Sequence, residues 1–248
     1  CAYKFKLDKL LRVPHAKKSH LAFGTSVHSA LEKFYLKFKD DGKVPSKEYL
    51  LSQFRSSLES SVITKADLAV YLKKGEDVLN SYYDLNAKDF VPPIEAEKKL
   101  RAHIGDIEIT GKLDRLEWAD KAARLVRVVD YKTGKPKTMG QIEGTTQDSD
   151  GELRRQLEFY KLLIDSDPSL NYKFGEGMLD FVEEPLEKGK DGKRRFQVTD
   201  KQIEELRKTI TRTMDSIRAL QFPRTTEYKK CEKCYFIDHC WPSGLPAR

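Results

Sequence analysis

One stretch decides how this sequence folds: Val128-Val129-Asp130-Tyr131-Lys132-Thr133-Gly134-Lys135. Its apolar start and its Thr-Gly end predict a strand that runs into a turn. Because side chains alternate along a strand, Asp130 and Lys132 project from one face while Tyr131 points to the other. A carboxylate and an ammonium placed together at a strand end can hold a divalent cation, although a lone pair of this kind is more often a surface ion pair.

A second acidic position lies sixteen residues upstream, at Asp114 in the run Gly111-Lys112-Leu113-Asp114-Arg115. Before it, two runs of alternating polarity flank Gly105-Asp106, and a Gly-first pair between such runs suits a two-residue type II′ hairpin. We therefore expect a three-stranded antiparallel meander over residues 94–132, in which Asp114 can face Asp130. Two converging carboxylates repel each other unless a cation lies between them.

These residues resemble a known family. Gly-x-x-Asp-Arg at 111–115, followed by Asp-Tyr-Lys-Thr-Gly-Lys at 130–135, is similar to the core of the PD-(D/E)XK nucleases, in the branch typified by the RecB-type nuclease domains. The resemblance implies an α/β fold with a restriction-endonuclease-like core, built as helix, three strands, helix and strand around a mixed sheet. The run 177–183 supplies the fourth strand, which a helical crossover allows to pair in parallel. Extra N-terminal helices are expected at 46–61 and 64–86, capped by Ser46 and Thr64.

The resemblance also implies a cation site. Apolar spacing from Val27 onward predicts a helix capped by Thr25 or Ser26, which would place His28 in its first turn. Gly-Thr-x-x-His at the start of a helix resembles the segment from which RecB-type nucleases supply a metal-binding histidine. By resemblance, Mg²⁺ or Mn²⁺ is then held by His28, Asp114, Asp130 and the backbone carbonyl of Tyr131. Lys132 would position the attacking water or stabilise the charge that gathers on phosphorus in the transition state.

Two further positions follow from the segment after the third strand. Residues 136–151 lack periodicity and predict a loop beside the site. Residues 152–164 predict a helix with Gln156 and Tyr160 four apart and hence on one face. In the RecB-like branch such a pair orients the substrate or the active-site lysine. Glu97, on the first strand, lies in an alternating surface pattern, and we expect no role for it.

Four cysteines give the other strong signal: Cys1, Cys231, Cys234 and Cys240. Nothing indicates secretion, which argues against disulfides. Four thiolates suit tetrahedral zinc as well as an iron–sulfur cluster, and His239 could replace one thiolate at zinc. One early cysteine with a late Cys-x2-Cys-x5-Cys resembles the iron–sulfur nucleases, namely AddB-type subunits and CRISPR-associated cluster nucleases. That resemblance favours a 4Fe-4S cluster over zinc, and either metal would act as a clasp that joins the chain ends.

Composition limits the class of protein. Charged residues make up 34% of the 248 residues and apolar residues 39%, which favours a soluble globular chain. No apolar run approaches the ~20 residues of a membrane-spanning helix, so no membrane partner is expected. The net charge of +7 weakly favours a polyanionic partner such as DNA, here expected to be single-stranded. The absence of a signal peptide predicts a cytoplasmic location.

We interpret residues 1–248 as a single nuclease domain. It would have a helical N-terminal part at 1–91, a catalytic core sheet at 92–198, and a long helix with the cysteine-rich clasp at 199–248. Because the chain opens at Cys1 rather than Met, we expect it to be an excised part of a longer protein. The expected parent is a helicase–nuclease of DNA repair or recombination, with a covalently linked UvrD/Rep-like or RecB-like helicase.

Two alternatives remain from the sequence. One is a stand-alone or CRISPR-associated iron–sulfur exonuclease. The other belongs to a different class and is a catalytically inactive module that holds DNA as a scaffold. Inactive relatives usually lose an acid or the lysine, whereas this chain keeps His28, Asp114, Asp130 and Lys132.

Overall fold

The computed structural model describes residues 1–15, 19–147, 149–183, 192–232 and 234–245. The chain forms two compact units, one made of Cys1–Lys18 with Lys208–Arg248 and the other of Ser19–Arg207. The sheet and every residue expected in the cation site belong to the second unit, whereas the four cysteines belong to the first. That both units together make one nuclease domain stays a prediction.

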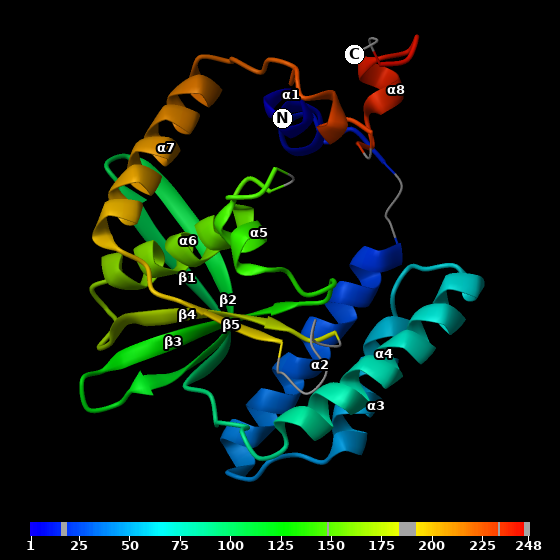
Figure 1. Cartoon of the computed structure of the whole chain (residues 1–248), viewed down its shortest axis with the longest axis vertical. Helices are drawn as coiled ribbons and strands as arrows, with labels where there is room; N and C mark the ends of the chain where they lie inside the picture. The colour runs from blue at the N-terminus through cyan, green and yellow to red at the C-terminus, as the bar shows by residue number, and fades with distance from the viewer. Residues whose placement is uncertain (16–18, 148, 184–191, 233, 246–248) are drawn as a thin grey trace. The chain divides into compact units, whose positions relative to one another are not determined.

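A five-stranded mixed sheet forms the centre of the second unit, in the order β1-β2-β3-β4-β5 (Figure 1). The first three strands pair antiparallel, β3 pairs with β4 in parallel, and β4 pairs antiparallel with β5. The expected α/β fold, meander and parallel fourth strand are therefore confirmed. The strands are β1 (Glu95–Ile104), β2 (Ile107–Asp120), β3 (Leu125–Lys132), β4 (Lys173–Phe181) and β5 (Lys193–Phe196).

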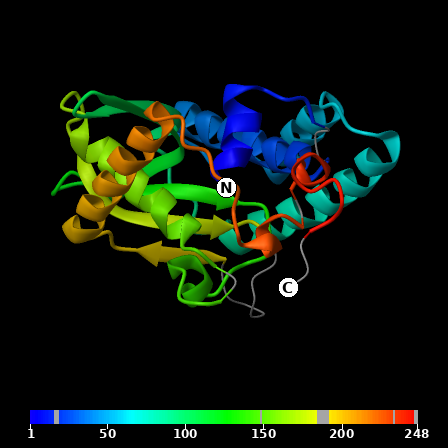
Figure 2. The same ribbon diagram turned by 90° about the horizontal axis from the view of Figure 1, so that it is seen from above.

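Helices cover both faces of this sheet (Figures 1 and 2). On one face, Val129 and Met178 are buried in a core with α2, α3 and α4. On the other face, a Cβ at Gly177 would lie 3.0 Å from Leu157 of α6, the helix that crosses from β3 to β4. Neighbouring residues of β4 thus face different helices. The helices that lie wholly in this unit are α2 (Ser19–Asp41), α3 (Lys47–Glu59), α4 (Lys65–Asn86), α5 (Met139–Glu143) and α6 (Glu152–Ser166).

Local sequence signals fix several of these elements. The Ser46 and Thr64 side chains accept hydrogen bonds from the backbone N–H groups of Tyr49 and Asp67, as expected for helix caps. Between β1 and β2, Ile104 pairs with Ile107, and the two-residue turn has a positive φ at Gly105 of +58°. A positive φ at the first turn residue alone is the mark of a type II′ turn.

Two expectations about helices are wrong. The helix that carries His28 begins at Ser19, so His28 lies well inside it and neither Thr25 nor Ser26 is its cap. Gly24 is not a helix start; a Cβ there would lie 3.1 Å from the Thr133 side chain, so glycine permits a close approach to the end of β3. The segment 136–151 is not all loop, because a reciprocal capping box between Thr138 and Gln141 starts α5.

The first unit contains both ends of the chain. It holds α1 (Ala2–Phe5), the π-helix η1 (Lys6–Leu10), the end of α7 (Asp200–Arg218), the 3-10 helix η2 (Tyr228–Lys230) and α8 (Ile237–Cys240). The Tyr3 backbone N–H donates to the carbonyl of Pro223, and the Tyr3 ring stacks on His239. Among the described residues, no helix is long and apolar enough to cross a membrane.

Candidate active site

The two expected acids lie where β2 and β3 stop pairing. The paired residues of these two strands run from Asp120 opposite Leu125 to Arg115 opposite Val129. One step further in the same register, Asp114 stands opposite Asp130. At that point the Asp114 carboxylate replaces a strand partner, because its Oδ2 accepts a hydrogen bond from the backbone N–H of Tyr131 at 2.8 Å. The opening between the strands thus exposes Asp114 to groups from the helices.

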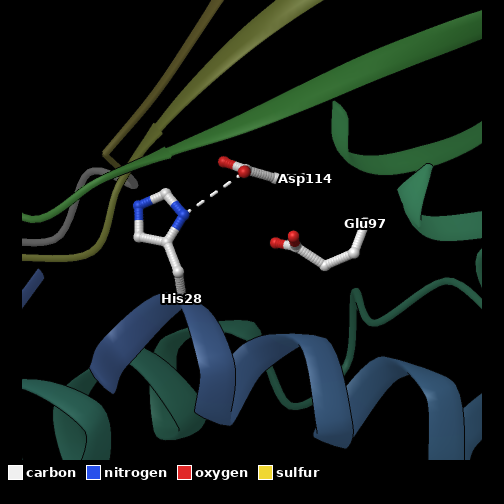
Figure 3. A group of neighbouring side chains, drawn as sticks. All are labelled: His28, Glu97 and Asp114. Atoms are coloured by element: carbon white, nitrogen blue, oxygen red, sulfur yellow. Dashed lines mark ion pairs between the residues drawn. The ribbon is translucent and has the colours of Figure 1, made fainter. Parts of the chain in front are cut away.

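His28 of α2 is one of those groups. Its Nδ1 lies 3.3 Å from Oδ1 of Asp114, as the dashed line in Figure 3 marks. Burial favours the neutral imidazole, but the hydrogen bond that His28 donates to Asp114 and the charges of Asp114 and Asp130 outweigh it, so the pKa of His28 is raised. The structure thereby brings together two of the expected ligands, from a helix and a strand far apart in sequence.

Asp130 is the centre of a second set of contacts. It is only 2% exposed, and its Oδ1 accepts hydrogen bonds from Gln156 Nε2 at 2.7 Å and from the Tyr160 hydroxyl at 2.6 Å. Lys132 Nζ lies 2.6 Å from Asp130 Oδ2 and donates to Gln156 Oε1 at 2.6 Å. Burial and the charge of Asp114 raise the pKa of Asp130, against the lowering effect of Lys132. Gln156 and Tyr160 therefore fix the acid and the lysine relative to each other.

Glu97 is a site residue that the sequence pattern missed. One ligand atom each from His28, Glu97 and Asp114 lies within 4.8 Å of the others, the single such group among the described residues (Figure 3). A signal for it was present in the sequence. Counting outward from the Gly105-Asp106 turn places Glu97 opposite Asp114, and the observed register agrees, because Ala96 pairs with Arg115 and Lys98 with Leu113.

The donor set suits a hard divalent cation. Mg²⁺ and Mn²⁺ prefer carboxylate, carbonyl and water oxygens, and Mn²⁺ also accepts imidazole. Two carboxylate oxygens at the site, Oε2 of Glu97 and Oδ2 of Asp130, are buried and accept no hydrogen bond from any described residue. Each has a lysine nearby at ion-pair distance without hydrogen-bond geometry. Buried carboxylate oxygens without donors are unfavourable unless a cation satisfies them, so the residues fit the expected metal.

A buried aromatic layer supports the site from the α2 side. The guanidinium of Arg115, 4% exposed, lies 4.0 Å from the ring centre of Tyr35 and 5.6 Å from that of Tyr131. In the same core, the Tyr82 hydroxyl donates to Asp180 Oδ2 at 2.7 Å. Tyr131, which lies between Asp130 and Lys132 in sequence, is thus packed in this core on the face of β3 opposite to both side chains.

The four cysteines lie together in the first unit. All four line one cavity of about 190 Å³ and all are free thiols. Burial raises the pKa of Cys240, Arg224 opposes this, and Cys234 and Cys231 raise it further. No three of these sulfurs lie within 4.8 Å of one another, since the one such group in the described chain is at His28. In tetrahedral zinc sites with Zn–S bonds of ~2.3 Å, sulfurs are about 3.8 Å apart.

The mixed sheet presents one acid from β2, and an acid and a lysine from β3, where these two strands stop pairing, as the sequence motifs of the nuclease family led us to expect. The sequence matches the family described as "PD-(D/E)XK nuclease superfamily" over residues 1–241. The chain therefore belongs to the PD-(D/E)XK nuclease superfamily, as the sequence motifs predicted. No curated protein matches it significantly.

Solved structures share the fold at low sequence identity. A "putative exonuclease" from Eubacterium rectale is 14% identical, with a TM-score of 0.55, over 99% of this chain and 82% of that one. The protein SSO0001 is 17% identical over 99% of this chain and 96% of that one, with a TM-score of 0.40. The first similarity supports the nuclease-like fold, and the second is too weak to carry an argument.

Proposed function

We propose that this chain is a Mg²⁺- or Mn²⁺-dependent deoxyribonuclease that hydrolyses phosphodiester bonds in single-stranded DNA. The observation that carries this proposal is the arrangement of Asp114, Asp130 and Lys132 at the open end of the β2–β3 pair. His28 extends the arrangement from α2, 3.3 Å from Asp114. A module that only held DNA would need neither the second acid nor the lysine, so the retained set favours catalysis over a scaffold.

The residues have distinct roles in this proposal. His28, Asp114, Asp130 and the Tyr131 carbonyl would hold the cation, which polarises the scissile phosphate and lowers the pKa of a bound water. Lys132 places its ammonium beside Asp130, where it can orient the water or stabilise negative charge that develops on the phosphate. Gln156 bonds to both Lys132 and Asp130, and so holds the lysine in that position.

The test is cleavage of labelled single-stranded DNA by the wild-type chain in Mg²⁺, in Mn²⁺ and in excess EDTA. We expect cleavage in either metal and none in EDTA. Cleavage rates of duplex DNA and of single-stranded RNA with the same sequence show whether single-stranded DNA is the preferred substrate. Tight DNA binding without cleavage in any metal would contradict the proposal and favour the scaffold.

We also propose that the four cysteines bind a 4Fe-4S cluster. Four thiolates are the complete ligand set of such a cluster. Their shared cavity supports a metal group bound by all four, and the motif resemblance favours the cluster over zinc. Since Cys1 and the other three cysteines come from opposite ends of the sequence, bound metal would close a long loop and stabilise the first unit.

The proposed biological setting is a helicase–nuclease of DNA repair or recombination in the cytoplasm, of the RecB or AddB type. This rests on the motif resemblance, and a stand-alone or CRISPR-associated exonuclease is its alternative. The full-length coding sequence is the test: helicase motifs in the same polypeptide are expected, and their absence would favour the alternative.

A further inference from the structure

Glu97 has a backbone conformation that its residue type disfavours. Its φ is +54°, in the left-handed region, where an L residue with a long side chain is strained. It stands inside β1, where no turn requires such an angle. Strain of this kind persists when surrounding structure enforces it, and it is concentrated at functional sites. The position therefore calls for a reason other than strand formation.

The strained residue marks a change of face in the hairpin. Beyond it, Leu100 is buried and pairs with Gly111, whose Cβ position would meet Leu163 of α6. Before it, Ala96 pairs with Arg115, whose guanidinium lies over Tyr35 of α2. With regular alternation Glu97 would share the exposed face of Lys99 and Arg101. In the structure Glu97 has a positive φ, and its carboxylate points toward His28 and Asp114 instead (Figure 3).

The carboxylate is buried without the hydrogen bonds that burial requires. The Glu97 side chain is 10% exposed, and its Oε2 accepts no hydrogen bond. Within the described part of the chain its counter-charge is Lys112, which forms an ion pair with the same oxygen and is half exposed. A simple surface ion pair contributes little stability and would justify neither the burial nor the strained backbone. A divalent cation beside His28 and Asp114 would justify both.

We propose that Glu97 is a further ligand of the cation and that Lys112 is the counter-charge it gives up when metal binds. The inference rests on the proposed function, because it assigns a residue to that same site. In the metal-free protein, Lys112 neutralises the carboxylate; as the cation enters, the exposed lysine swings into solvent. Lys112 thus competes with the cation and weakens its binding.

The test measures Mn²⁺ affinity directly, by electron paramagnetic resonance of free Mn²⁺ and by calorimetry, without substrate. Glu97→Gln should weaken binding at least tenfold, given that loss of a ligand's hydrogen-bond partner alone costs ~10–100-fold. Lys112→Met should strengthen binding at least about threefold, because a neighbouring positive charge is removed. Two substitutions on the same hairpin serve as matched controls. Glu108→Gln changes an acid that pairs with Arg101, and Lys99→Met changes the lysine opposite Lys112. Both variants should bind Mn²⁺ with wild-type affinity.

A second readout is the stability of the metal-free protein. Glu97→Gly should raise its melting temperature, since glycine adopts a positive φ without strain. An unchanged Mn²⁺ affinity in Glu97→Gln would overturn the inference, while DNA cleavage by the wild type would leave the proposed function standing. A lowered melting temperature in metal-free Glu97→Gly would also overturn it, because Glu97 would then be a stabilising structural residue. A wild-type protein that neither binds Mn²⁺ nor cleaves DNA would overturn the proposed function itself.

Discussion

Asp130 combines burial, negative charge and two hydrogen-bond donors on one side chain. Tyr160 and Gln156 donate to Oδ1, which leaves Oδ2 with only the neighbouring lysine and no hydrogen bond. Such a carboxylate is costly to keep charged in the absence of a cation, and this cost explains why its pKa is raised. The protein alone thus leaves part of the negative charge at this site without a hydrogen-bond donor.

The charge of Asp130 is therefore expected to be essential. Asp130→Asn keeps the shape of the side chain but removes its negative charge, so cleavage of single-stranded DNA in Mn²⁺ should fall by at least ~10²–10³-fold. The control Asp41→Asn changes an exposed acid that pairs with Lys37 and should cleave normally. Wild-type cleavage by Asp130→Asn would show that the site is assigned to the wrong residues.

Tyr160 is expected to act as a positioning residue through Asp130. Tyr160→Phe removes the hydroxyl that lies 2.6 Å from Asp130 Oδ1, and should lower Mn²⁺ affinity by ~10–100-fold, as for other partners of metal-binding side chains. The melting temperature should change little, since the ring stays in place. Tyr172→Phe is the control, because its buried hydroxyl has no hydrogen-bond partner. Equal metal affinities in the two variants would argue against the role of Tyr160.

At the scale of elements, the sequence predicted the sheet well and the helix boundaries less well. Turn chemistry at Gly105-Asp106 and strict alternation on either side are local signals, so the meander could be deduced without tertiary information. The start of α2 could not. Gly24 has the local signature of a helix breaker, yet it lies inside α2. There its missing side chain makes room for Thr133, the residue after β3, a contact between residues far apart in sequence.

The candidate site depended on the family resemblance as well as on local pattern. Strand alternation and helical spacing place the side chains on common faces, but their assignment to a site came from the motif resemblance. The structure brings these side chains together, and their roles stay predictions: Asp114, Asp130, Lys132, Gln156 and Tyr160. Glu97 was missed because alternation placed it on the exposed face, whereas in the structure it has a positive φ and its carboxylate lies near His28 and Asp114. A period-2 pattern cannot reveal a residue that interrupts the period, although the hairpin register places it opposite Asp114.

Packing between α3 and α4 gives a prediction at the same scale. Gly75 of α4 is buried against the Phe54 ring, and a Cβ at Gly75 would lie 1.9 Å from that ring. Gly75→Ala should lower the free energy of unfolding by about 1–3 kcal/mol through overpacking, despite the higher helix propensity of alanine. Urea denaturation measures the change. The exposed Val70→Ala in the same helix should stay within about 0.5 kcal/mol of wild type, and equal stability of both variants would contradict the packing.

For the whole molecule, the cysteines connect metal binding to folding. If they bind an iron–sulfur cluster, anaerobically purified protein should be brown, with iron and sulfide in comparable amounts, whereas zinc would give a colourless protein. Cys234→Ala should lower the melting temperature and solubility, because it removes one of four ligands that join distant segments. A colourless zinc protein would exclude the cluster but keep the clasp. A Cys234→Ala protein as stable as wild type would exclude both.

The central claim is that a cation held at the β2–β3 opening contacts the scissile phosphate. The most direct measurement compares cleavage of single-stranded DNA that carries one phosphorothioate, with sulfur in place of a non-bridging oxygen. Mg²⁺ binds sulfur poorly, whereas softer metals accept it. We predict that the thio-substrate is cleaved slowly in Mg²⁺ and that Mn²⁺ or Cd²⁺ restores the rate, for one sulfur stereoisomer. Equal cleavage of both substrates in every metal, or cleavage that survives EDTA, would contradict the account.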